Sequence, residues 1–322
     1  MKFTKVAIVM AWMGTALLLH GPARAQTYPS QNIHVIGAFP PGSGSDIIVR
    51  FFAEKLRPFA DKPIIVESKP GANGKIATEY TARSKPDGHT LFIHAGNALA
   101  SNSLLIKNNP VDVVKQIAVA ATINQQGFMV VVDSKSPVKT VPDLTDLLKK
   151  KGDKASFGSS SNQGLIAGSL LNEMGKFSAV FVNYRTSADS LNDLASGAID
   201  YAIIDPAAAL AMERNGRVRP IAVMLPQRLP FRPDIPTLTE FGFPIEIVGW
   251  FAAMVPAETP RPIVIQLNQC INQIIDTDEA RKFMTDIGAT PWISKPEDGK
   301  ARLVADITTW RRYVDVAKLV PQ

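Results

Sequence analysis

Residues 33–46 read IHVIGAFPPGSGSD and combine the two features that decide the fold. Residues 33–39 form a short apolar run, which is typical of a strand buried on both faces. Residues 40–46 are rich in proline, glycine and serine, and an amphipathic pattern follows through Leu56. The stretch therefore predicts a strand, a tight loop and a helix, the unit from which parallel α/β sheets are built.

The same order of elements recurs along the chain. Each predicted strand is followed by a turn signal and then by a segment with helical spacing of apolar residues. We predict an α/β fold of two lobes with a cleft between them, each lobe a mostly parallel sheet flanked by helices. The further predicted strands are residues 64–66, 90–94, 128–132, 155–157, 179–182, 199–204, 218–223 and 245–255.

Two long segments, near residues 120–130 and 245–255, are the candidate crossovers between the lobes. If both cross, the first lobe is discontinuous and is built from the beginning and the end of the chain. The predicted division is residues 26–124 with 248–322 for one lobe, and residues 125–247 for the other.

Residues 1–25 have the features of a secretory signal peptide. Lys2 and Lys5 give a basic start, and residues 6–19 form an apolar run. That run is about 14 residues long, shorter than the roughly 20 that span a bilayer. Residues 23–25 match the A-x-A cleavage pattern. We therefore predict a secreted protein that is cleaved after Ala25.

The composition is that of a folded protein. The chain has 322 residues, of which 46% are hydrophobic and 20% charged, which is enough for two domains and excludes a disordered or collagen-like chain. Cleavage would remove Lys2, Lys5 and Arg24 but no acid, so the net charge falls from +6 to +3. This charge is too small for a nucleic-acid-binding protein. The single Cys270 can form no internal disulfide.

Two Gly/Ser loops are the candidate binding elements. Gly42 and Gly44 would let the backbone approach a ligand, while Ser43 and Ser45 add hydroxyl donors. The loop at residues 159–164 offers similar neutral donors ahead of another helix. Because a helix N-terminus attracts anions, two such loops facing a cleft would hold a small anion. The alternative is that each loop is an ordinary turn with a polar cap.

Three further side chains lie in predicted loops between a strand and a helix. Tyr184 and Arg185 follow the strand at 179–182, and Arg185 could pair with a ligand carboxylate or be a surface arginine. Asp205 ends an apolar strand before Pro206. It is therefore either the N-cap of the next helix or a cleft residue.

Catalytic and cofactor motifs fit poorly. Residues 158–162, GSSSN, lack the last glycine of the G-x-S-x-G nucleophile motif. His89 and His94 are five residues apart and would point to opposite faces of a strand, so they make a poor metal pair. We expect no enzyme activity, no cofactor and no metal. The alternative is a secreted serine hydrolase that uses a hydroxyl of Ser159–Ser161.

An ordered series of short motifs covers nearly the whole chain after the predicted signal peptide. The most specific are FPPG at 39–42 with Asp46, ESKPGANG at 67–74 and PDGHTL at 86–91. FGSS at 157–160 and PDIPT at 233–237 follow in order. With this series the chain resembles the periplasmic solute-binding proteins of tripartite tricarboxylate transporters, the Bug family.

The resemblance implies a Venus-flytrap protein of type II-like fold that works in the periplasm as a monomer. It implies a small mono- or dicarboxylate ligand, aliphatic or aromatic, which is handed to membrane permease subunits. A sensor subunit that docks on a receptor is the alternative. In similar proteins the loops matching Phe39–Asp46 and Ser159–Gly164 hold one ligand carboxylate. Ser43, Ser161 and Arg185 depart from the usual family residues, which puts the ligand's identity in doubt.

Pattern and resemblance together give one set of candidate ligand-binding residues. The set is Phe39, Pro40, Gly42, Ser43, Gly44, Ser45, Asp46, Asn97, Ser159, Ser160, Ser161, Asn162, Gln163, Gly164, Tyr184, Arg185 and Asp205.

Overall fold

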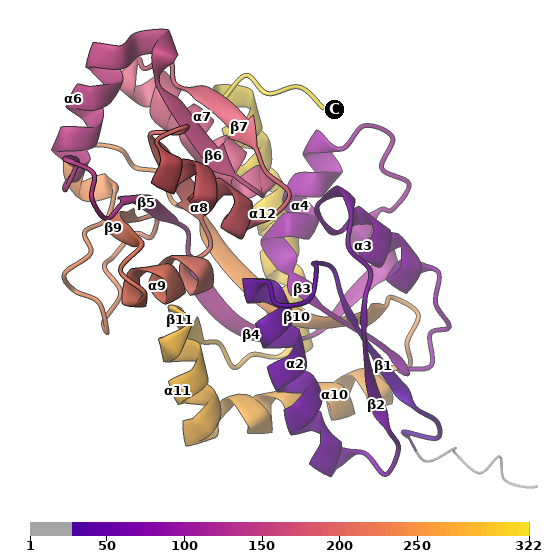
Figure 1. The fold of residues 1–322 in the computed structure, drawn as a ribbon. Coiled ribbons are helices and arrows are strands. Elements are labelled where there is room, and N and C mark those ends of the chain that lie inside the picture. Colours follow the sequence, from indigo (N-terminus) through magenta and orange to yellow (C-terminus); the bar gives the residue numbers. More distant parts are fainter. Residues whose placement is uncertain (1–27, 322) are drawn as a thin grey trace, which may run out of the picture.

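The computed structural model describes residues 28–321, which form two lobes, each with a β-sheet covered by helices (Figure 1). The predicted signal peptide lies outside the described residues. The first sheet has the order β11-β4-β10-β3-β1-β2, and the second has the order β7-β6-β8-β5-β9.

The first sheet collects strands from both ends of the described chain. β1, β2 and β3 run parallel, whereas β10 is antiparallel to both of its neighbours, and β11 is antiparallel to β4. The sheet is therefore mixed, where a mostly parallel one was expected, because β10 returns from the second lobe in the opposite direction. Its strands are β1 (Ile33–Gly37), β2 (Ile64–Ser68), β3 (Thr90–Ala95), β4 (Ile117–Gly127), β10 (Val248–Pro256) and β11 (Ala289–Pro291).

The second sheet is mixed for a similar reason. β6 pairs in parallel with β7 and with β8, and β5 pairs antiparallel with β8 and β9. β5 enters directly from the first lobe, so its direction is set by β4 rather than by a helical crossover. The strands are β5 (Met129–Asp133), β6 (Ser156–Ser159), β7 (Val180–Asn183), β8 (Tyr201–Ile204) and β9 (Val218–Val223).

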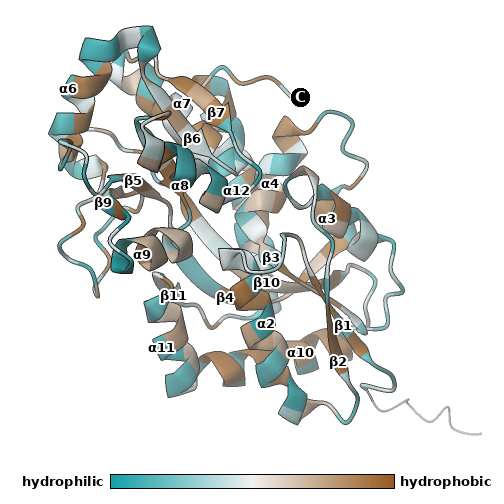
Figure 2. Ribbon diagram, viewed as in Figure 1, coloured by the Kyte–Doolittle hydropathy of each residue, from teal (hydrophilic) through white to brown (hydrophobic). Residues whose placement is uncertain are grey.

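Helices cover the faces of both sheets and turn their polar residues outward, as the hydrophilic surface of α11 shows (Figure 2). In the first lobe they are α2 (Gly44–Leu56), α3 (Lys75–Ala82), α4 (Gly96–Leu105), α5 (Val113–Gln116), α10 (Arg261–Ile275), α11 (Asp278–Asp286) and α12 (Pro296–Val316). In the second lobe they are α6 (Val141–Lys151), α7 (Asn162–Gly175), α8 (Ser187–Ser196) and α9 (Pro206–Arg214). Short 3-10 turns occur at Arg57–Phe59, Ala72–Gly74, Gly152–Lys154 and Thr239–Phe241.

The chain crosses between the lobes where β4 passes into β5 through Phe128. The return segment lies beside this crossing, since Met224 N donates to Phe128 O at 2.8 Å and Ile247 N to Met224 O at 3.0 Å. Val248 then pairs with Gly127. β10 therefore begins at Val248, later than the predicted start of that strand at 245, because the preceding residues follow the second lobe.

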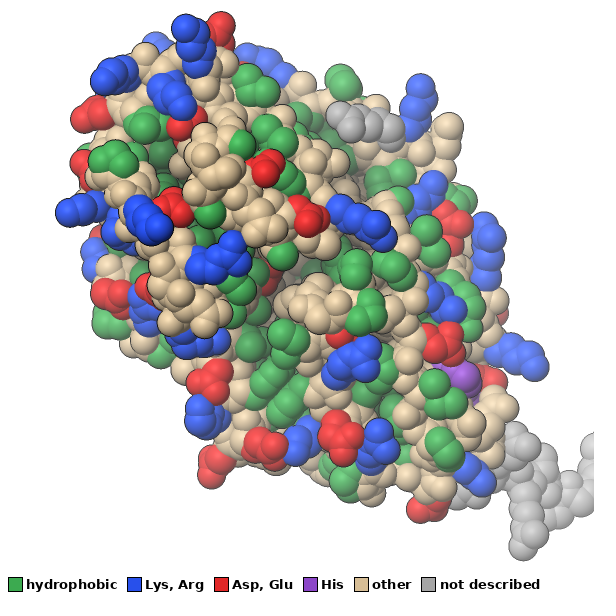
Figure 3. Space-filling view, viewed as in Figure 1, with side chains coloured by type: hydrophobic (Ala, Val, Ile, Leu, Met, Phe, Trp, Pro, Cys, Tyr) green, Lys and Arg blue, Asp and Glu red, His purple; other side chains and the backbone are tan. Residues whose placement is uncertain are grey.

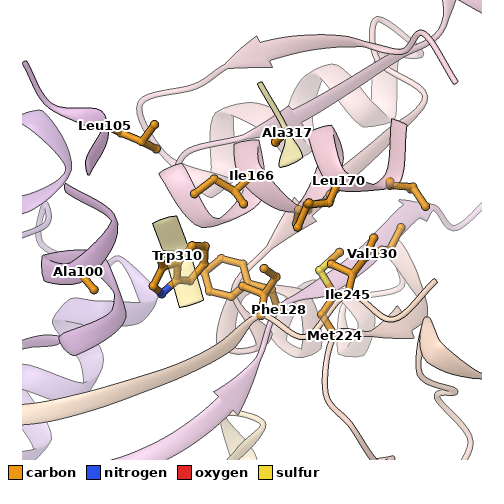
Figure 4. Close-up of a cluster of buried hydrophobic side chains, with 14 of the residues drawn as sticks. Ala100, Leu105, Phe128, Val130, Ile166, Leu170, Met224, Ile245, Trp310 and Ala317 are labelled. Carbon is orange, nitrogen blue, oxygen red and sulfur yellow. The ribbon is translucent and has the colours of Figure 1, made fainter. Parts of the chain in front are cut away.

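Helix α12 is a third connection. Its first half packs on the first sheet, where Trp250 Nε1 donates to Asp306 Oδ2 at 2.6 Å. Its second half brings Trp310 and Ala317 into a buried cluster with Phe128 and Ile166 (Figure 4). The hydrophobic core is therefore continuous from one lobe to the other beside the crossover strands.

Candidate functional site

A cavity of about 340 Å³ lies between the two lobes and is lined by residues of both. We call it the interlobe cavity. Its polar lining comes mainly from the loops that follow β1, β6, β7 and β8. Its apolar lining includes Phe39, Ile47, Phe128, Met212 and Phe251. The charged side chains seen in Figure 3 are spread over the visible face of both lobes with their signs mixed.

The first Gly/Ser loop, Phe39–Ser45, leads from β1 into α2. Gly42 has φ +82°, a left-handed conformation that glycine adopts without strain. Ser43 is the N-cap of α2, and its side chain accepts a hydrogen bond from Asp46 N at 3.2 Å. Asp46 Oδ2 in turn accepts from Gly42 N at 2.8 Å and from Arg50 Nε at 2.8 Å. Asp46 therefore fixes the loop and does not line the interlobe cavity.

The second loop, Ser159–Gly164, leads from β6 into α7. Ser161 is the N-cap, and its Oγ accepts from Gly164 N at 3.2 Å. Ser159 Oγ accepts from Ser161 N at 3.3 Å, which folds the loop back on itself. A Cβ on Gly164 would overlap Ser159 Oγ, so glycine is required for this close approach. Ser159, Ser160 and Ser161 all line the interlobe cavity.

The amides that follow this loop join the lobes to each other. Asn73 Nδ2 donates to Asn162 Oδ1 at 3.0 Å, and Asn162 Nδ2 donates to Asn102 Oδ1 at 3.0 Å. Gln163 Nε2 donates to Ser101 Oγ at 3.0 Å. Asn162 does not line the cavity, whereas Gln163 does. Both amides therefore bond across the lobes in this structure. The sequence analysis had named the two residues as candidates for binding a ligand.

Asp205 is the N-cap of α9 and also lines the cavity. Its Oδ1 accepts from Ala208 N at 2.9 Å and its Oδ2 from Ser187 Oγ at 3.2 Å. Burial raises the pKa of the Asp205 carboxyl above its ordinary value. Gly44 of the other lobe approaches it closely, since a Cβ there would lie 2.7 Å from Asp205 Oδ1. The two lobes therefore meet at this point.

Tyr184 and Arg185 are placed differently although they are neighbours. Tyr184 Oη donates to Asp193 Oδ2 at 2.7 Å within the second lobe and does not line the cavity. Arg185 does line the cavity, is exposed, and has no carboxylate partner within residues 28–321. It is the cation among the described cavity residues.

Most of the candidate residues thus come together around one cavity. Asp46, Asn162, Gly164 and Tyr184 are the ones that do not line it. The candidates that line it are Phe39, Pro40, Gly42, Ser43, Gly44, Ser45, Asn97, Ser159, Ser160, Ser161, Gln163, Arg185 and Asp205.

Sequence reasoning missed part of the lining. Ser187 follows Arg185 by two residues, and its place in the same loop could have identified it. Gln126, Phe128, Met212 and Phe251 also line the cavity but lie in strands, at a crossover or in a helix, where no local pattern marks them.

The cavity has donors suited to an anion. Helices α2 and α7 begin at it, and unpaired N–H groups at a helix N-terminus attract negative charge. None of the histidines within residues 28–321 lines it, so the serine hydroxyls have no imidazole base. Among those same residues no cluster of His, Cys, Asp or Glu could hold a metal ion.

Comparison with known proteins identifies the family. A family model described as the tripartite tricarboxylate transporter family receptor, TctC, matches residues 48–317. The chain belongs to this family. Relatives include BugT of Bordetella pertussis, 26% identical over 98% of both chains. Another is a UPF0065 protein of Bordetella bronchiseptica, 30% identical over 93% of this chain and 89% of that protein.

Solved structures agree with the fold. Rpa4515 of R. palustris, determined with adipate, superposes with a TM-score of 0.87 at 26% identity, covering 92% of this chain and 100% of that one. The periplasmic binding protein BugD superposes with a TM-score of 0.83 at 24% identity over 92% of this chain and 100% of its own. The predicted family and the two-lobed α/β fold are confirmed. No helix within residues 28–321 has the length and apolar character needed to cross a membrane.

Proposed function

We propose that this TctC-family receptor is a periplasmic binding protein that captures a small carboxylate in the interlobe cavity and delivers it to membrane permease subunits. The observation that carries the proposal is the convergence of two Gly/Ser loops, each at a helix N-terminus, on one cavity between the lobes. Adipate in the related Rpa4515 supports the ligand class. We propose binding without catalysis, since no histidine of the described residues lines the cavity to act as a base for its hydroxyls.

Binding couples to closure of two lobes. We propose residues 26–124 with 248–322 as one lobe and 125–247 as the other, with the last turns of α12 resting on the second. The ligand carboxylate accepts hydrogen bonds from Ser43 of the first lobe and from Ser159–Ser161 of the second. A carboxylate held from both sides favours the closed arrangement because it bonds to both walls only there. The protein acts as a monomer after cleavage behind Ala25.

Arg185 provides the sharpest test of carboxylate binding. It is exposed and unpaired within residues 28–321, so Arg185→Gln should leave folding intact. Loss of a charge-assisted contact should weaken carboxylate binding about tenfold. Calorimetry measures the affinities of the unaltered protein and of Arg185→Gln for a panel of small organic acids. Both proteins are first freed of carried-over ligand by unfolding and refolding.

Arg311→Gln is the matched control, because Arg311 is an exposed arginine on α12 that does not line the cavity. It should bind as the unaltered protein does. A folded protein that binds no acid of the panel refutes the proposal. Turnover of ester substrates, with covalent labelling of a serine, would instead show a hydrolase.

A further inference from the structure

The interlobe cavity has two chemically different ends. In the second sheet, Arg185 follows β7 and Ser159–Ser161 follow the adjacent β6, while Phe128 precedes β5. β5 is two strands from β6, so the crossover end lies about 10 Å from the serine end at the usual strand spacing. The cation and the N-termini of α7 and α8 are therefore at the serine end.

Gln126 lines the crossover end of the cavity. It is the second-last residue of β4, two residues before Phe128. Gln126 is only 5% exposed, and its side-chain Oε1 has no hydrogen-bond partner within residues 28–321. A buried amide oxygen without a donor is costly, and such groups in proteins are nearly always satisfied.

Two other polar side chains, Asn97 and Asp205, lie near this end, and the Nδ2 of Asn97 has no hydrogen-bond partner within residues 28–321. Asn97 Oδ1 accepts from Trp250 N at 3.4 Å. Asp205 is occupied by Ala208 N and Ser187 Oγ. No cation lines the crossover end among the described residues. A second carboxylate there would be buried without a counter-charge, which is strongly unfavourable.

A neutral polar group fits this end far better. The Gln126 amide both donates and accepts, and rotation by half a turn exchanges the two roles. We propose that Gln126 selects the ligand's far end, and that the ligand carries a carboxylate at one end and a neutral hydroxyl, carbonyl or amide at the other. This inference rests on the proposed carboxylate-binding function and narrows its substrate class.

Three acids of equal chain length test the selection. 6-Hydroxyhexanoate, hexanoate and adipate share the near carboxylate and differ at the far end. The protein should bind 6-hydroxyhexanoate about fivefold or more tighter than hexanoate, because one satisfied hydrogen bond separates them, and tighter than adipate. 4-Hydroxybenzoate, benzoate and terephthalate form a second, aromatic series. Calorimetry gives all six dissociation constants.

Gln126→Leu keeps the approximate size of the side chain and removes its hydrogen-bonding groups. In this variant the ratio of the dissociation constants of hexanoate and 6-hydroxyhexanoate should fall to nearly one. Hexanoate itself should bind as well as before or better. A purely structural role would weaken all ligands alike and leave the ratio unchanged. Thermal unfolding of the variant shows whether it is folded.

Gln125→Leu is the matched control. Gln125 is the neighbour of Gln126. It lines a separate groove, which Gln126 also borders, and Gln125 does not line the interlobe cavity. The hydroxyl preference should survive in this variant. Two results would overturn the assignment of Gln126 but leave carboxylate capture intact. One is tighter binding of the dicarboxylate than of the hydroxy acid in both series. The other is a preference for the hydroxy acid that is retained in Gln126→Leu. Absence of binding to any carboxylate overturns both.

Discussion

At the scale of single residues, Asp205 shows how one side chain can cap a helix and shape a cavity. The sequence allowed either role for it, and the structure shows the N-cap in detail while also placing the residue on the cavity wall. The cost is that a carboxylate is buried next to the helix start. Hydrogen bonds from Ala208 N and Ser187 Oγ oppose that cost, yet burial dominates and the pKa is raised.

Replacing Asp205 by asparagine should therefore stabilise the protein at neutral pH. The folded protein holds the Asp205 proton more tightly than the unfolded chain does, so stability from this group falls as pH rises above the ordinary pKa of aspartate. Asparagine caps helices as well as aspartate and carries no charge. Asp205→Asn should raise the free energy of unfolding at pH 7, and by a smaller amount at pH 4, close to the ordinary pKa of aspartate.

Denaturant unfolding at the two pH values measures this difference. Asp146→Asn is the control, because the Asp146 side chain is 80% exposed and should show no such dependence. Lower stability of Asp205→Asn at pH 7 would mean that the carboxylate is favoured by its partners rather than penalised by burial.

Single residues also show where sequence reasoning stops. Ser43 and Ser161 are N-caps, and the sequence allowed a polar cap in each of their loops as the alternative to a ligand-binding role. Asp46 and Tyr184 lie in the correct loops, but their side chains turn to Arg50 and Asp193. Which partner a polar side chain takes depends on how the loop packs, and neighbouring residues alone do not determine that.

At the scale of elements, local periodicity predicts strands and helices better than it predicts their pairing. The strand predicted at 218–223 is β9 itself, whereas β11, only Ala289–Pro291, is absent from the predicted strands. A three-residue strand carries no periodic signal. The antiparallel direction of β10 follows from the path of the chain through the second lobe, which no local pattern records.

The amide contacts that join α7 to α4 and to the 3-10 turn Ala72–Gly74 are an element-scale feature with a measurable role. Asn162→Ala removes the hydrogen bonds to Asn73 and Asn102, which join one lobe to the other. We propose that these hydrogen bonds form only when the lobes close, so the affinity for carboxylate should fall about fivefold to tenfold. An unchanged affinity would show that they persist on opening, beside the buried cluster to which α4 and α7 contribute. Calorimetry with the best acid of the panel measures the change.

Asn172→Ala provides the comparison within the same helix. Asn172 bonds to the backbone of Ala179 inside the second lobe, through Nδ2 at 2.8 Å and Oδ1 at 3.3 Å. Its removal should lower the melting temperature but leave the dissociation constant unchanged. Equal losses of affinity in both variants would show that the effect is general destabilisation and not interlobe closure.

At the scale of the whole molecule, three connections between the lobes lie close together, and we expect the hinge of the proposed closure there. The crossing at Phe128, the return segment before Val248 and the middle of α12 share one buried cluster, to which Trp310 and Ile245 belong (Figure 4). Residues near this cluster are held from both lobes. The contact between Gly44 and Asp205 belongs instead to the facing walls, so it is expected to separate when the lobes open.

Spin labels can compare these two regions during closure. In a Cys270→Ser background, one pair, Glu54→Cys and Ser196→Cys, places labels at the far ends of α2 and α8, on opposite lobes and away from the hinge. A second pair, Gln227→Cys and Ala305→Cys, lines the groove beside the crossover strands. Adding a carboxylate that the protein binds should shorten the distance between the labels of the first pair and narrow its distribution, because the ligand bridges both walls. The distance between the labels of the second pair should change little. A first distance that is the same with and without ligand would show that the lobes are already fixed in the closed arrangement, and affinity would then not depend on hinge motion.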